Sequence, residues 1–311
     1  MTDDASDGPI TYVLRHLIIG GGRYDVPSSK VEFDALRVAA LGIDEIVAIE
    51  NAYAANIENF IELEKGVTAL IVSNAVENLD IENYDDARRT AGRLVDNLLS
   101  SSRSFMDQCE KRLVKACGRA IKTDFDVLRA RVKAESQAFR MMEVIRNHAQ
   151  HVGTSVTSIT MGMRREETEQ DMKLIHTLSP LMQLKHLKAD RKLIAKHPEA
   201  FAEIEALADP RKGTIDLMPL IRGYIEGLSA VLEGVRAILR PYEDAWFAAD
   251  KAAFDRMSGE GRPQTGHAAV ILQGNRALDS EDLSSWNIDR VKILRKRHRS
   301  LKHHTRFQLR H

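Results

Sequence analysis

The stretch FRMMEVIRNHAQHVG, residues Phe139 to Gly153, decides the fold of this chain. Apolar residues in and next to it recur at intervals of four, three, four and three positions: Ala138, Met142, Ile145, Ala149 and Val152. This spacing places them on one face of an α-helix. Thr123 and Asp126 provide a capping signal, and Gly153 provides a stop. The pattern predicts one amphipathic helix over residues 124–152.

The sequence on both sides also predicts helices. No proline occurs between residues 28 and 179, which permits long helices. A second apolar stripe comprises Leu94, Leu98, Phe105, Met106, Cys109 and Leu113. We expect two or three helices between Ser29 and Asn78, with Gly42 and Gly66 as candidate breaks. The sequence also predicts helices over Glu166–Leu187, over Arg191–Leu207 with a break at Pro198, and over Leu217–Leu239.

Three segments depart from the helical pattern. The apolar run Ile10–Ile19 precedes three glycines and predicts a short strand. The β-branched stretch TSVTSITM, residues 154–161, is compatible with either a strand or a loop. Residues 258–282 are rich in Gly, Pro, Gln, Asn and Ser, which predicts a linker or an exposed loop.

These patterns predict an all-α protein built around a helical bundle. We expect a mostly helical N-terminal segment over residues 1–82 and the bundle over residues 83–257. Residues 258–311 are expected to form a loop or linker followed by a basic C-terminal tail.

The charge is balanced overall but unevenly distributed. The chain has 45 basic and 45 acidic residues, so the whole molecule has no net field that would attract nucleic acid. Residues 290–311, however, contain nine Lys or Arg and no acid. This tail is either a solvated end or an arm that grips RNA phosphates without sequence choice. The candidate RNA-binding residues are Arg295, Lys296, Arg297, Arg299 and Lys302.

Cysteine usage and the N-terminus predict a cytoplasmic location. Cys109 and Cys117 are eight positions apart in a helical pattern, about 12 Å along a helix, which is too far to bridge. They are typical of free thiols in a reducing compartment. The N-terminus is acidic where a secretory signal would be basic, and no apolar run reaches the roughly 18 residues of a membrane span.

The polar residues of the deciding stretch form a candidate site. Asn147 and His151 are four positions apart and point away from the apolar stripe, on the same face as Glu143 and Arg140. Arg146 lies about 140° from His151 around the helix. One chain would therefore struggle to direct both at one phosphate. Either the last turn loosens, or a second copy of the helix completes the site across a twofold axis.

These residue types fit RNA cleavage without a metal. The helix C-terminus favours the imidazolium of His151, and Asn147 can orient its ring. An imidazole can take a proton from a ribose 2′-hydroxyl or give one to the leaving 5′-oxygen. Arg146 could hold the phosphate and stabilise its transition-state charge. The products would be a 2′,3′-cyclic phosphate and a 5′-hydroxyl.

Arg146, Asn147, three residues and then His151, at the end of a long bundle helix, resemble the Rx4-6H motif of the HEPN superfamily. The resemblance covers residues 85–153. It implies a helical bundle, dimers in which two motifs face each other, and a ribonuclease that acts as a toxin or antiviral effector. By this resemblance Arg146 and His151 are catalytic, and Asn147 orients or binds. The neighbouring Glu143, Arg140 and His148 are further candidates for orienting or binding. Similar bacterial proteins often have an aromatic residue where this chain has His148.

The leading hypothesis is therefore a metal-independent HEPN endoribonuclease that acts on RNA as a homodimer and needs no cofactor. It would be a toxin or phage-defence effector, and any antitoxin or regulatory protein would be a separate chain. The alternative is a non-catalytic HEPN scaffold, or a module that binds a nucleotide or a partner. A third is a helical adaptor that binds nucleic acid through the basic tail.

Simpler roles exist for each residue of the motif. Arg146 can pair with Glu143 one turn back, and His151 can cap the helix C-terminus. His148 and His151 are three positions apart and could start a metal site. No third ligand has a recognisable spacing, so we expect no metal.

Overall fold

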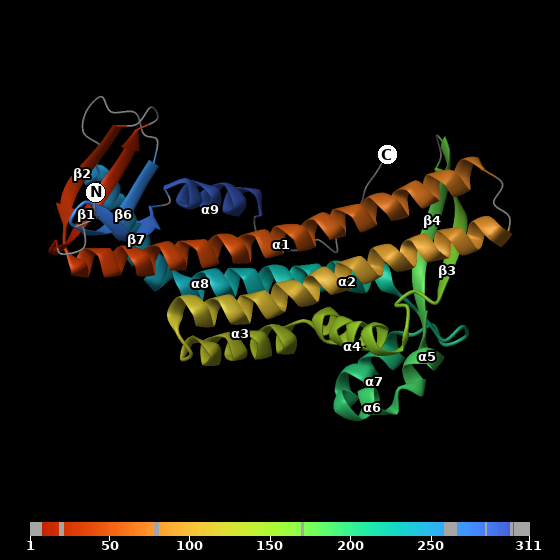
Figure 1. Cartoon of the computed structure of the whole chain (residues 1–311). Helices are drawn as coiled ribbons and strands as arrows, with labels where there is room; N and C mark the ends of the chain where they lie inside the picture. Colours follow the sequence, from red (N-terminus) through yellow and green to blue (C-terminus); the bar gives the residue numbers. More distant parts are fainter. Residues whose placement is uncertain are drawn as a thin grey trace, which may run out of the picture. The chain divides into compact units, whose positions relative to one another are not determined.

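The computed structural model describes residues 8–18, 22–77, 81–168, 171–257, 266–283, 285–298 and 301, and most of these are helical. The predicted predominance of helices is confirmed (Figure 1). The described residues also form two small antiparallel sheets, so the chain is not purely α-helical.

Long helices occupy the proline-free part of the chain. They are α1 (Lys30–Val76), α2 (Ile81–Cys117), α3 (Ile121–Glu135) and α4 (Gln137–Val152). The single helix predicted over residues 124–152 is in fact two, because Ser136 caps the start of α4 by accepting a hydrogen bond from the Phe139 backbone at 3.2 Å. The predicted end at Gly153 is confirmed.

Gly42 and Gly66 do not break α1, contrary to the expectation. Both make room for a neighbouring side chain. A Cβ atom at Gly42 would lie 2.4 Å from the Trp246 ring, and one at Gly66 would lie 2.3 Å from Leu94 Cδ1. The glycines therefore allow close packing of the helix at a modest cost in helix propensity.

The prediction of a helix over Glu166–Leu187 is wrong. Residues Ser158–Thr168 (β3) and Asp171–Gln183 (β4) form an antiparallel hairpin. Thr214–Asp216 (β5) pairs with the end of β4. Of the β-branched stretch 154–161, residues 158–161 begin β3, and residues 154–157 lie outside any strand. The pairing of β3 with β4 prevails over the helical pattern that we expected from Glu166 onward.

Three short helices follow β4: α5 (Leu184–Ala189), α6 (Arg191–Lys196) and α7 (Pro198–Leu207). The expected break at Pro198 is confirmed. Helix α8 (Leu217–Met257) extends well past the predicted end at Leu239 and contains Pro241. No helix of the described residues combines the length and apolarity needed to cross a membrane.

The chain divides into two compact units, each assembled from separate stretches. Unit 1 comprises Met1–Asn51, Gln108–Phe125 and Val235–Arg299. Unit 2 comprises Ala52–Asp107, Asp126–Gly234 and Ser300–His311.

Unit 1 contains a four-stranded sheet in the order β2-β1-β6-β7. Its strands are β1 (Ile10–Ile18), β2 (Gly22–Ser28), β6 (Gly266–Gln273) and β7 (Arg276–Asp282). The predicted first strand is confirmed. Residues 258–265 of the predicted loop lie outside the described residues, but residues 266–282 form a hairpin instead. Its apolar run AAVIL is mostly buried, and Gly274 turns the chain with a φ of +57°.

The sheet of unit 1 packs on its helices through a buried apolar cluster. The cluster comprises Leu14, Phe33, Leu36, Ala253, Met257, Ala269 and Leu283. On β1 and β6, the buried His16 and His267 are register partners, and their rings stack 4.6 Å apart at 22°. Neither ring nitrogen of His16, nor Nε2 of His267, has a hydrogen-bond partner among the described residues.

The predicted basic tail begins as a helix. Residues Ser285–Arg297 form α9 in unit 1. Of the five candidate RNA-binding residues, Arg299 and Lys302 lie outside the described residues.

Candidate functional site

Helix α4 carries the motif and lies within unit 2. Its predicted apolar face is confirmed at Met142 and Ile145, which are fully buried. The helix packs on α7 and on α8, where the rings of Phe139 and Tyr224 are 5.2 Å apart. A Cβ atom at Gly227 of α8 would lie 2.6 Å from Phe139 Cδ2, so a glycine is needed for this approach.

Arg146 is buried, with only 2% of its surface exposed. Its Nη1 forms a short ion pair with Glu143 Oε1, and its Nη2 donates to Glu143 Oε2 at 3.2 Å. Nη2 also donates to Asn147 Oδ1 at 3.1 Å, and the Tyr224 hydroxyl donates to Glu143 Oε1 at 3.1 Å. We call Glu143, Arg146, Asn147 and Tyr224 the Arg146 cluster.

The Arg146 cluster satisfies most of the polar atoms that it buries. Burial, together with the nearby Glu143 carboxylate, raises the pKa of Tyr224, so its hydroxyl stays a donor. Arg146 Nε is the exception and has no partner among the described residues. A buried cation is stable only when an anion such as the Glu143 carboxylate pairs with it. Removing one member of a buried ion pair typically costs about 3–5 kcal/mol of stability.

His151 lies apart from this cluster. It is exposed in the last turn of α4. Within the described part of the chain, no hydrogen bond or ion pair links His151 to Arg146. The two predicted catalytic residues are therefore not brought together in one chain, in keeping with their angular separation on the helix.

His148 has a packing role. It is buried, and its Nδ1 is 3.8 Å from Asp190 Oδ2, too long for a hydrogen bond. Burial lowers the pKa of His148, and the Asp190 carboxylate only partly opposes this shift. Asp190 also accepts a hydrogen bond from the Leu193 backbone at 3.0 Å and so caps α6. Among the described residues, no three His, Cys, Asp or Glu side chains gather as a metal site.

Arg140 connects three helices of unit 2. Its guanidinium donates to both carboxylate oxygens of Glu203 on α7, at 3.2 and 2.5 Å. It also donates to the carbonyls of Lys133 and Ala134 near the end of α3, at 2.7 Å each. The Glu203 carboxylate raises the pKa of Arg140. These contacts assign Arg140 a structural role.

Sequence reasoning missed two residues near the motif. Tyr224 joins the Arg146 cluster from α8, 78 positions further along the chain. His197, at the start of α7, is half-buried and close enough to Glu143 and Arg146 for both to influence its pKa, which burial lowers. Neither residue belongs to a motif, because only tertiary packing brings them to α4.

The candidate RNA-binding residues of α9 divide into two kinds. Arg295 donates to both oxygens of Glu243, at 2.6 and 2.8 Å, and to Glu50 Oε1 at 3.0 Å. Its guanidinium is therefore occupied within unit 1. Lys296 and Arg297 are exposed.

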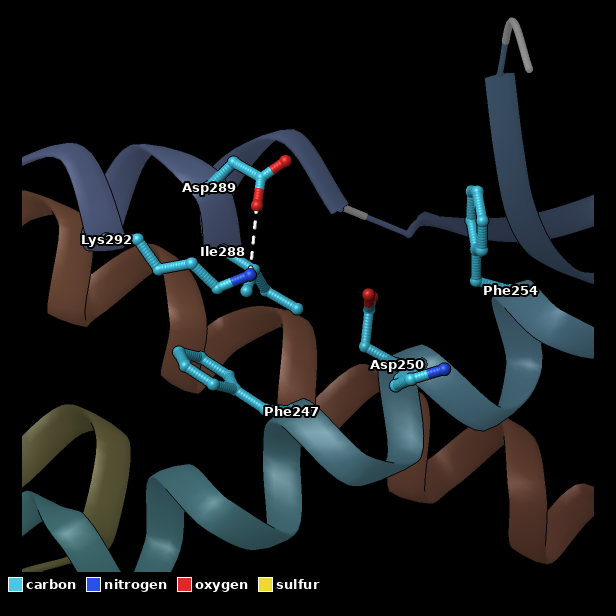
Figure 2. Close-up of a pocket in the computed structure, with 7 residues that line it drawn as sticks. Phe247, Asp250, Phe254, Ile288, Asp289 and Lys292 are labelled. Atoms are coloured by element: carbon cyan, nitrogen blue, oxygen red, sulfur yellow. Dashed lines mark hydrogen bonds and ion pairs between the residues drawn. The ribbon is translucent and has the colours of Figure 1, made fainter.

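Figure 2 shows a shallow cavity in unit 1, between α8 and α9. Its volume is about 230 Å³, and its lining includes Phe247, Asp250 and Phe254 of α8 and Ile288 and Lys292 of α9. The Lys292 ammonium is already paired with Asp289 at 3.0 Å. The cavity contains none of the residues predicted to form a site.

No family model, curated protein or solved structure matches the chain. The roles of its residues are therefore inferred from their geometry. That geometry separates an enclosed arginine, Arg146, from an exposed histidine, His151, on the same helix.

Proposed function

We propose that this chain is a non-catalytic helical scaffold of the HEPN type, in which the α4 motif stabilises unit 2. The observation that supports this function is the burial of Arg146 in its pair with Glu143. A catalytic arginine has to contact the scissile phosphate in the transition state. An enclosed guanidinium with two side-chain partners is poorly placed for that contact.

Access by RNA would require the cluster to open. Arg146 would have to leave Glu143, and the Tyr224 hydroxyl would lose an acceptor if the carboxylate followed. Such a change would expose a packed surface and leave buried polar groups without partners, which is costly. In the proposed function the buried part of the motif stabilises unit 2, and the exposed end of α4 is available for contacts.

A second candidate function is the metal-independent endoribonuclease. It is favoured by the exposure of His151 in the last turn of α4, where RNA can reach the imidazole. This enzyme would be a dimer whose assembly releases Arg146 from Glu143 and places it near a partner's imidazole. It would then act as a toxin or a phage-defence effector on RNA.

One experiment distinguishes the two functions. Purified wild-type protein, His151→Ala and Arg146→Ala are incubated with single-stranded RNA in EDTA, and thermal unfolding of each protein is measured in parallel. We expect no cleavage by any of them, a large fall in the melting temperature of Arg146→Ala and an unchanged melting temperature for His151→Ala.

Cleavage in EDTA that His151→Ala abolishes would reject the non-catalytic function in favour of the endoribonuclease. Because His151 is exposed, that variant is expected to stay folded, so a loss of cleavage could not be attributed to unfolding. The control variant is Lys133→Ala, which removes an exposed charge from α3 in the same unit.

A further inference from the structure

Helix α9 presents an apolar and basic face that is exposed among the described residues. Trp286 is 76% exposed and Ile293 is 65% exposed, although both are large apolar residues. The opposite face, with Ile288, Val291 and Leu294, is buried against unit 1. The helix is therefore anchored by one side and leaves an indole ring on the other.

The exposed side chains form a stripe along α9. Trp286, Arg290, Ile293 and Arg297 are spaced by four, three and four positions, which places them on one helical face. The stripe is about 16 Å long by the rise of an α-helix. It alternates an apolar residue with an arginine, and the exposed Lys296 flanks its C-terminal end. We call these five residues the α9 face.

The charge of α9 is strongly positive. Residues 285–297 contain five Lys or Arg and one acid, Asp289, which pairs with Lys292. Arg295 is neutralised by Glu50 and Glu243 beneath the helix. Lys296 and Arg297 form no ion pair within the described residues. These two cations are thus available to an anionic partner.

We propose that the α9 face binds single-stranded RNA, with a base stacked on Trp286 and phosphates held by Arg290, Lys296 and Arg297. An aromatic ring beside cations is the arrangement that sequence-independent single-strand binding uses, because every base has a π-face and every nucleotide a phosphate. Arg290 donates to Asn51 Oδ1 at 3.2 Å, and its other donors form no hydrogen bond with the residues that the structure describes. Ile293 provides an apolar surface for a second base.

The same face is a poor membrane anchor. An interfacial helix inserts a continuous apolar side into lipid, and on α9 that side already packs against unit 1. The exposed face has two apolar side chains separated by Arg290. Charge complementarity together with an isolated indole therefore favours a nucleic acid strand. The proposal goes beyond the function of α4, because it needs neither Arg146 nor His151.

Fluorescence polarisation of a labelled 12-nucleotide oligo(U) tests the proposal on the full chain. We expect wild-type protein to bind with an affinity that falls steeply between about 50 and 200 mM salt. Trp286→Ala is expected to weaken binding about tenfold, whereas Trp286→Phe keeps much of it. Lys296→Ala/Arg297→Ala is expected to lower the slope of log affinity against log salt by about 1.4, because each phosphate contact with a single strand contributes about 0.7.

The matched control is Arg211→Ala/Lys212→Ala, which removes two adjacent exposed cations from a loop of unit 2 and should leave binding unchanged. The proposal is overturned if wild-type protein does not bind oligo(U), or if both α9 variants bind as tightly as wild type. Binding to phosphatidylserine vesicles without oligo(U) binding would also overturn it and identify a membrane surface. Cleavage of bound RNA would instead reject the non-catalytic function and leave the α9 face intact.

Discussion

Helices α4 and α9 both bury one apolar face and both end in residues that were candidates for RNA contact, but they place their cations differently. Helix α4 encloses Arg146 against Glu143 and exposes His151. Helix α9 occupies Arg295 with two carboxylates and exposes Lys296 and Arg297. The difference teaches that the availability of a cation depends on its helical face and on the nearest acid, even between adjacent positions.

The largest expected effect concerns the enclosed cation of α4. Arg146→Ala leaves Glu143 without its partner and should lower the free energy of unfolding by about 3–5 kcal/mol, measured by urea denaturation. The triple variant Arg146→Met/Glu143→Leu/Tyr224→Phe should recover much of this loss, because it removes both charges together with the buried hydroxyl that donates to Glu143, and keeps apolar volume. An unchanged stability of Arg146→Ala would show that the cluster does not hold unit 2 together.

Two neighbouring residues of α9 sharpen the contrast between its faces. Leu294 is buried, so Leu294→Ala should cost about 2–5 kcal/mol through lost burial and a cavity. Ile293 is exposed, so Ile293→Ala should change stability by less than about 0.5 kcal/mol. Equal costs in urea denaturation would mean that α9 does not dock on unit 1 by the Leu294 face.

A pH titration compares the buried histidines of the two units. Burial and the neighbouring His16 lower the pKa of His267 in unit 1, while Asp190 partly opposes the lowering at His148 in unit 2. A base with a lowered folded pKa contributes stability that is fully present above its unfolded pKa of about 6.5 and is lost as the pH falls toward the folded value. Wild-type protein should therefore lose stability below about pH 6.5.

His267→Phe tests which unit is responsible, since it keeps a ring against His16 and removes one titrating group. We expect this variant to depend less on pH than wild type when its melting temperature is followed by circular dichroism. His148→Phe should have the smaller influence. The reverse order would place the sensitive histidine in unit 2.

The smallest expected effect belongs to the exposed end of α4. His151→Ala should leave the free energy of unfolding within about 0.5 kcal/mol of wild type, because an exposed residue that forms no ion pair with the described residues contributes little. The measurement is again urea denaturation, with Arg146→Ala as the reference for a large change. A loss above about 2 kcal/mol would show that His151 has a structural partner in solution.

Local signals in the sequence identified much of the helical fold. The spacing of Met142 and Ile145 located the buried face of α4, and Gly153 marked its end. Pro198 separated α6 from α7, as expected for a residue without an amide hydrogen. These features depend on a few consecutive residues, so they can be predicted without tertiary structure.

Features that depend on distant partners could not be predicted in this way. Residues of β3 and β4 have a helical sequence pattern but form a hairpin, because strand formation depends on contacts with the paired strand and not on local sequence alone. For the candidate site, angular reasoning predicted different helical faces for Arg146 and His151, and in the structure Arg146 is buried whereas His151 is exposed. It could not reveal that Tyr224 closes the cluster from α8, or that Glu50 and Glu243 occupy Arg295.

The contact between Gly42 and Trp246 in unit 1 links two positions that are 204 residues apart in the chain. Any side chain at position 42 would overlap the indole, so α1 accepts a larger residue there only if position 246 becomes smaller. In relatives of this protein the two positions should therefore covary. Such a pair would mark the register of α1 against α8 in an alignment, even where no catalytic motif is shared.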